Sequence, residues 1–82
     1  MGKREKLFIQ LLHGTSDTNI SFNALCSLMQ FLGFSARIKG SHHIFWRDDI
    51  IEIINIQPVG AFAKPYQVKQ IRELLLKYHL ET

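Results

Sequence analysis

The sequence predicts an α+β fold, a two-layer sandwich in which helices cover one face of a three-stranded antiparallel sheet. Apolar residues recur at steps of three and four in three separate segments, which is helical spacing. Between the last two of these segments, β-branched and aromatic residues dominate, as they do in strands. Two short turns divide that stretch, and short turns join antiparallel neighbours. With 82 residues there is room for one domain, over residues 1–82.

The first two helices are expected before the strands. Residues 3–12 combine a charged first turn with apolar residues at helical spacing, and a loop rich in turn-forming residues follows at 13–19. Ser21 can cap the second helix, because its hydroxyl can accept from a free first-turn amide. The apolar stripe of that helix is Phe22, Leu25, Leu28, Met29 and Leu32. Gly33 then stands where a left-handed C-cap belongs.

The strand-forming stretch follows Gly33. We expect strands at residues 34–39, 42–47 and 50–56. Gly40-Ser41 and Asp48-Asp49 form the two turns between them. Phe45 and the isoleucines of the last strand are expected to lie in the core. Pro58 ends the sheet, because proline has no amide to donate to a neighbouring strand.

The last helix is introduced by a loop at 59–64 and by Pro65, which suits the first position of a helix. The apolar stripe of this helix is Val68, Ile71, Leu74, Leu75 and Tyr78. Lys69 and Arg72 lie away from the stripe, so part of the opposite face is basic. The predicted order is therefore α-α-β-β-β-α.

Composition narrows the classes of function. Ten Lys and Arg against seven Asp and Glu give a net charge of +3, which permits a polyanionic partner without demanding one. The single cysteine, Cys26, excludes an intrachain disulfide and a thiolate metal cluster, and we interpret it as a small buried hydrophobe. No run approaches the roughly 18 apolar residues of a membrane span. The cytoplasm is the expected location, with no membrane association.

Two segments carry a family resemblance. The first is Gly33-Phe34 followed by Arg37-Ile38-Lys39-Gly40-Ser41-His42-His43-Ile44-Phe45. The second is Ile54-Asn55-Ile56-Gln57-Pro58 and then Ala63-Lys64-Pro65-Tyr66-Gln67-Val68-Lys69-Gln70-Ile71-Arg72. Together they resemble HicA toxins (mRNA interferases) of bacterial type II toxin–antitoxin systems. The similarity runs from about residue 21 to residue 78, and the chain departs from shorter members by its helix at 3–12.

The resemblance implies a fold like that of double-stranded-RNA-binding domains, with the helix at 3–12 as an addition. It also implies an endoribonuclease that cleaves mRNA without a metal or another cofactor and is neutralised by a HicB-type antitoxin. The catalytic histidine of the family maps onto Gly40-Ser41-His42. Because the histidine is doubled here, His43 is the second choice for the role.

The chemistry of the histidine pair agrees with such an activity. RNA carries its own nucleophile, the 2′-hydroxyl, so a protein needs only to move protons and stabilise phosphate charge. Histidine can act as base or acid near neutral pH. Neighbouring strand residues point to opposite faces, so His42 and His43 do not share a pocket. We choose His42, with Gly40 and Ser41 letting the phosphate backbone approach. A metal site is disfavoured, since adjacent histidines diverge.

Cationic residues near these elements are candidates for RNA contacts. They are Arg37, Lys39, Lys64, Lys69 and Arg72, each of which is equally consistent with a solvated surface. Trp46 shares strand parity with His42 and is suited to base stacking, to the core or to an antitoxin contact. His13 and His79 are expected in solvent. Two other classes stay open: a non-catalytic RNA-binding module of the same fold, and a protein-interaction domain.

Overall fold

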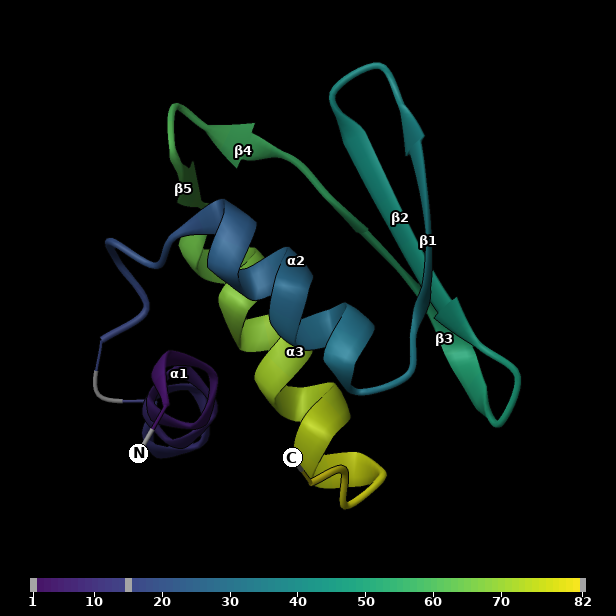
Figure 1. Ribbon diagram of the computed structural model, residues 1–82, viewed down its shortest axis with the longest axis horizontal. Coiled ribbons are helices and arrows are strands. Elements are labelled where there is room, and N and C mark those ends of the chain that lie inside the picture. The colour runs from purple at the N-terminus through teal and green to yellow at the C-terminus, as the bar shows by residue number, and fades with distance from the viewer. Residues whose placement is uncertain (1, 15, 82) are drawn as a thin grey trace.

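The computed structural model describes residues 2–14 and 16–81 and has the predicted α+β character (Figure 1). The elements are α1 (Lys3–His13), α2 (Phe22–Phe31), β1 (Ser35–Lys39), β2 (His42–Arg47), β3 (Ile50–Ile56), β4 (Pro58–Val59), β5 (Phe62–Ala63) and α3 (Pro65–Lys77). Figure 1 shows α2 and α3 on one side of the sheet formed by β1, β2 and β3. Helix α1 packs against α2 and α3. Of the loop predicted at 13–19, residue 15 lies outside the described residues.

The helix ends follow from local chemistry. The Ser21 side chain accepts a hydrogen bond from the Ala24 amide at 3.2 Å, which satisfies one free donor of the first turn of α2. Gly33, with a φ of 94°, takes the left-handed conformation that ends the helix. Pro65 opens α3. These three predictions are confirmed, and so is the apolar stripe of α2, whose members are all buried.

The sheet has the strand order β1-β2-β3, and both junctions are antiparallel. The register pairs Lys39 with His42 and Ile44 with Asn55, and a bulge interrupts it between Phe45 and Arg47. One face, here called the inner face, packs on the helices through His43, Phe45, Ile54 and Ile56. The opposite, outer face carries Arg37, Lys39, His42, Ile44, Trp46, Ile51, Ile53 and Asn55.

The isoleucines of β3 are divided between these faces. Ile50, Ile54 and Ile56 are buried, with exposed fractions of 6%, 1% and 0%. Ile51 and Ile53 are 90% and 64% exposed, so the prediction that the whole series lies in the core was wrong for these two. The reason is that side chains alternate along a strand while the helices cover only one face.

The predicted loop at 59–64 was also wrong, because β4 and β5 form a short hairpin there. This hairpin pairs with the segment that precedes α2. The Ala63 amide donates to the Ile20 carbonyl at 2.8 Å, and the Phe22 amide donates to the Ala61 carbonyl at 3.0 Å. Such pairing depends on a partner far away in the sequence, so local turn chemistry does not reveal it.

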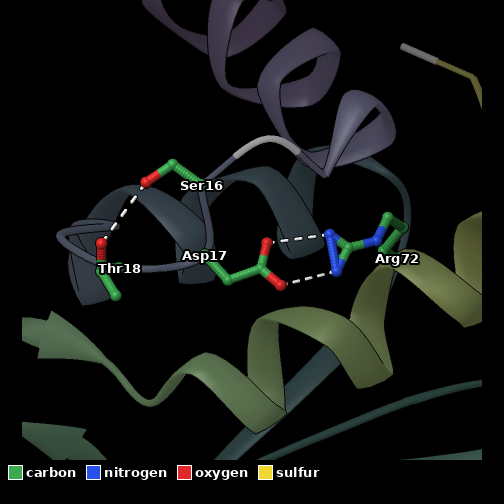
Figure 2. Close-up of polar contacts among 4 residues, drawn as sticks. All are labelled: Ser16, Asp17, Thr18 and Arg72. Carbon is green, nitrogen blue, oxygen red and sulfur yellow. Dashed lines mark hydrogen bonds and ion pairs between the residues drawn. The ribbon is translucent and has the colours of Figure 1, made fainter.

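The loop between α1 and α2 is fastened to α3 by a bidentate ion pair (Figure 2). The Arg72 guanidinium donates to the two carboxylate oxygens of Asp17 at 2.8 and 2.7 Å. Its side chain is only 14% exposed. Helix α1 itself is held by apolar contacts and by Arg4, whose guanidinium carbon lies 3.9 Å from the centre of the Phe31 ring. Arg72 therefore serves to hold the helical layer together.

Candidate functional site around His42

His42 is the first residue of β2, and it is exposed on the outer face of the sheet. It follows the turn at Gly40 and Ser41, both of which are exposed. Gly40 has a φ of 62°, a left-handed conformation that suits glycine. Apart from its two chain neighbours, no described residue has a heavy atom within 4 Å of the position a Cβ would take. The main chain beside His42 is thus open to a ligand on that side.

Both ring nitrogens of His42 contact amide side chains. Nδ1 lies 3.1 Å from Oδ1 of Asn55, and Nε2 lies 2.7 Å from Nε2 of Gln57. Asn55 Oδ1 can accept a hydrogen bond from Nδ1–H of the ring. Gln57 Nε2 is also 2.9 Å from Nδ1, and an atom almost equally far from the two ring nitrogens lies over the face of the ring and not along either lone pair.

A shallow hollow of ≈ 260 Å³ lies beside His42. It is lined by His42, Asn55, Gln57, Lys64, Tyr66 and Gln67. The lining therefore holds three carboxamides, a phenol, an ammonium and an imidazole, and it contains no carboxylate. The Lys64 ammonium lies 6.0 Å from the centre of the Tyr66 ring, and Tyr66 itself is 64% exposed. This set of groups suits an anionic ligand that also offers hydrogen-bonding edges.

His43 points the other way. Its ring meets the Phe22 ring edge-on at 4.8 Å between centroids, and its Nδ1 lies 4.0 Å from the Cys26 sulfur. Burial raises the pKa of the Cys26 thiol to about 11, so the thiolate is scarce near neutral pH. The predicted divergence of the two histidines is confirmed, and His43 lies within the packing between the sheet and α2.

The predicted cationic residues fall into three groups. Arg37 and Lys39 stand on the outer face, where Lys39 is the cross-strand partner of His42. Lys64 lines the hollow. Lys69 is exposed on α3 but does not line the hollow, and Arg72 is engaged by Asp17 in the helical layer. The structure therefore gathers three of the five cations on the side of His42.

Four residues of the hollow escaped prediction as site residues: Asn55, Gln57, Tyr66 and Gln67. Asn55 and Gln57 alternate at the end of β3, so a correct β2–β3 register would have brought them beside His42. Tyr66 and Gln67 belong to the first turn of α3. No local pattern identifies them, because their place depends on how α3 docks against the end of the sheet.

Two further findings concern the described residues as a whole. Within residues 2–14 and 16–81, no three His, Cys, Asp or Glu side chains gather as a metal site would require. None of the described helices has the length and apolar character needed to cross a membrane. His13 and His79 are exposed, as predicted.

Fold and site together define a small α+β protein with one histidine on an open sheet face, flanked by amides and cations. Comparisons with protein-family models, curated proteins and solved structures found no match to the chain. The chemistry of the His42 hollow itself is therefore the basis on which a function can be assigned.

Proposed function

We propose that this chain is a toxin of the HicA type, a cytoplasmic endoribonuclease that cleaves mRNA by histidine catalysis and is neutralised by a HicB-type antitoxin. We propose likewise that its fold is of the double-stranded-RNA-binding kind, extended by α1. The observation that carries the proposal is the exposed imidazole of His42 in a hollow that holds an ammonium and no carboxylate. A polyanion can approach such a hollow without meeting like charge.

The cleavage step needs few groups. The 2′-oxygen of a ribose attacks the adjacent phosphorus, the bond to the 5′-oxygen breaks, and a 2′,3′-cyclic phosphate forms. His42 takes the 2′ proton at Nε2, because Asn55 contacts the other ring nitrogen, Nδ1. Lys64 stabilises the extra negative charge on the phosphate. The departing 5′-oxygen takes its proton from water.

The outer face also supplies cations and an aromatic side chain for positioning RNA. Arg37 and Lys39 are exposed there, and neither forms an ion pair with another described residue. Side chains of this kind hold a phosphate backbone without reading its sequence. Trp46 is half-buried on the same face and can stack on a base. The antitoxin would use the same face, since Ile51 and Ile53 offer apolar surface that RNA does not need.

A second candidate function is a non-catalytic RNA-binding module. The observation in its favour is that His43 packs on Phe22, which leaves a single described histidine beside the hollow. A ribonuclease with one histidine relies on water for the second proton transfer. A pure binder needs neither transfer and uses only the cations and Trp46.

The deciding experiment is incubation of a defined mRNA with purified protein in EDTA, with mapping of the cut ends. The wild type should leave 2′,3′-cyclic or 3′-phosphate ends, and His42→Ala should leave the RNA intact. His79→Ala is the matched control, because His79 is exposed and does not line the hollow. Binding is followed in parallel by fluorescence anisotropy over a salt series.

Intact RNA after incubation with folded, RNA-binding wild type would favour the binding module. Cleavage by His42→Ala at the wild-type rate would remove His42 from the mechanism. A lack of RNA affinity even at low salt would contradict both candidates and favour a protein-interaction domain.

A further inference from the structure

A second hollow lies beside the one that contains His42. Its volume is ≈ 250 Å³, and its lining comes from the loop between α1 and α2, the β4–β5 hairpin and the start of α3. The lining residues are Thr18, Asn19, Val59, Phe62, Ala63, Lys64 and Pro65. Of the described residues, only Lys64 lines both hollows. The two hollows therefore meet at this lysine, and the second is here called the Phe62 hollow.

The Phe62 hollow has apolar walls and a polar rim. Val59 and Phe62 are 58% and 46% exposed, although both are large apolar residues. Thr18 and Asn19, also exposed, add a hydroxyl and a carboxamide. Apolar walls with a few polar groups are typical of small-ligand sites. The described residues of this lining include no carboxylate, so an anionic ligand meets no like charge there.

The Thr18–Asn19 side of the hollow is held at both ends. At one end, Asp17 accepts the bidentate pair of hydrogen bonds from Arg72 at 2.8 and 2.7 Å (Figure 2). At the other end, the Ile20 carbonyl accepts from the Ala63 amide at 2.8 Å. A site whose walls are already ordered loses less conformational entropy on binding. The ion pair also neutralises the Asp17 carboxylate, which would otherwise repel an anion beside Thr18.

These groups suit a nucleobase, which has two flat π faces and a polar edge. The Phe62 ring offers a surface on which a base can stack. The Asn19 carboxamide carries both donors and an acceptor, as pairing with the edge of a base requires. Lys64 stands between this hollow and His42, and the sugar–phosphate chain joins every base to a phosphate. An apolar side chain of a protein partner would use neither the ammonium nor the carboxamide.

We infer that the Phe62 hollow binds the base of a nucleotide adjoining the scissile phosphate, with Phe62 stacking on the base and Asn19 at its edge. The inference rests on the proposed function, because it takes RNA as the ligand. It adds a second point of attachment, so that the base in one hollow and the phosphate at Lys64 together orient the ribose toward His42. Single-stranded RNA fits such a site, since its bases can be turned out of a stack.

The test begins with mononucleotides, followed by NMR. Inorganic phosphate should shift only the signals of the His42 hollow, including Lys64. Adenosine 3′- or 5′-monophosphate should in addition shift the ring signals of Phe62 and the methyl signals of Val59. One of the two should bind roughly tenfold more tightly than inorganic phosphate, which is the size of effect that stacking one base gives.

Phe62→Leu removes the aromatic face and keeps an apolar side chain. It should reduce the affinity for the mononucleotide to that for inorganic phosphate, and leave phosphate binding unchanged. Phe31→Leu is the matched control, because Phe31 is 50% exposed and lines neither hollow. This control should bind both ligands as the wild type does.

A second variant keeps the inference testable if Phe62→Leu does not fold. Asn19 has a φ of 59°, which glycine adopts without strain, so Asn19→Gly removes the carboxamide and preserves the loop. It should weaken mononucleotide binding severalfold and leave phosphate binding as it was. Unchanged mononucleotide binding in both folded variants would overturn the inference.

The same site is then tested in RNA by making one nucleotide at a time abasic. The wild type should lose affinity roughly tenfold at one position adjoining the cut, whereas in Phe62→Leu the same change should cost nothing more. RNA that is bound and cut without any such position would overturn this inference and leave the proposed function standing. Base-dependent binding without cleavage would support this inference and the binding module.

Two further outcomes would also decide against the inference. A lack of affinity for RNA, mononucleotide and phosphate would overturn both this inference and the proposed function. Shifts of the Val59 and Phe62 signals when protein alone is concentrated would show that a second copy of the chain covers the hollow, and this inference would then be withdrawn.

Discussion

The two faces of the sheet share two residue types, histidine and isoleucine, but bury them to very different extents. Each carries a histidine from the start of β2 and isoleucines from β3. On the inner face, His43 packs edge-on against Phe22 and Ile54 is 1% exposed. On the outer face, His42 is held by amides and Ile53 is 64% exposed. Residue type thus decides little here, because strand parity and the position of the helices assign each side chain its role.

The largest effect is expected at the centre of the inner face. Phe45 is 1% exposed, so Phe45→Ala should lower the free energy of unfolding by about 3–5 kcal/mol through lost burial and a cavity. That is comparable to the whole stability of roughly 3–5 kcal/mol expected for a domain of this size. Urea denaturation followed by circular dichroism measures it, and a folded variant with an unchanged midpoint would contradict the assignment of this face.

A smaller effect should separate the two histidines. We expect His43→Ala to lower the free energy of unfolding by about 1–2 kcal/mol, because it removes a packed ring from the contact with Phe22. For the exposed His42, alanine should change it by less than about 0.5 kcal/mol. The same denaturation assay compares the variants. If the two variants lost equal free energy of unfolding, the assignment of His43 to a buried face and His42 to an exposed face would be contradicted.

A pH effect is expected where the edge of the sheet meets α3. A hydrogen bond from Lys77 and another from Tyr78 lower the pKa of the Glu52 carboxyl from 4.5 to about 2. Because the folded pKa is below the unfolded one, this carboxylate stabilises the fold above about pH 4.5, and the contribution is lost as the pH falls toward 2.

The measurement for this prediction is the melting temperature of wild type and Glu52→Gln between pH 2 and pH 7. The difference between the two melting temperatures should be largest near pH 7 and smallest near pH 2. Glu73→Gln serves as control, since it changes an exposed carboxyl that forms no ion pair within residues 2–14 and 16–81. A Glu52→Gln difference independent of pH would contradict the linkage.

The smallest effect is expected on the outer face. Ile51 is 90% exposed, so Ile51→Thr should change the free energy of unfolding by no more than about 0.5 kcal/mol. Threonine keeps the β-branched shape that suits a strand. A loss well above 1 kcal/mol in dilute protein would mean that this side chain is covered, and the contrast between the faces would have to be withdrawn.

Much of this fold is local, and that part could be predicted. The stripe of α2, the Ser21 cap and the position of Pro65 depend on residues a few places apart in sequence. What could not be predicted depends on contacts between distant segments. The β4–β5 hairpin is held by the hydrogen bond from the Ala63 amide to the Ile20 carbonyl. The ion pair between Arg72 and Asp17 joins residues that are 55 positions apart in the sequence.

The site divides in the same way. Alternation along β2 was enough to send His42 and His43 to opposite faces. Predicting which residues lie beside His42 needs the β2–β3 register as well. That register brings Asn55 and Gln57 to His42, and it is interrupted by a bulge. Predicting the position of Gln67 needs, in addition, knowledge of how α3 docks against the sheet. Sequence thus predicts the position of the imidazole, and only the tertiary structure reveals what holds it.

The pairing of the segment around Ile20 with the β4–β5 hairpin has a consequence for the order in which the chain folds. The β1–β2–β3 meander closes through short turns, whereas Ala63 must reach back to Ile20 past the whole of α2 and the sheet. Closing a longer loop costs more chain entropy, so such contacts form more slowly than hairpins. Lys64 and Tyr66 follow directly on that late contact. The sheet that carries His42 would therefore be made early, and the hollow beside it would be completed only as folding ends.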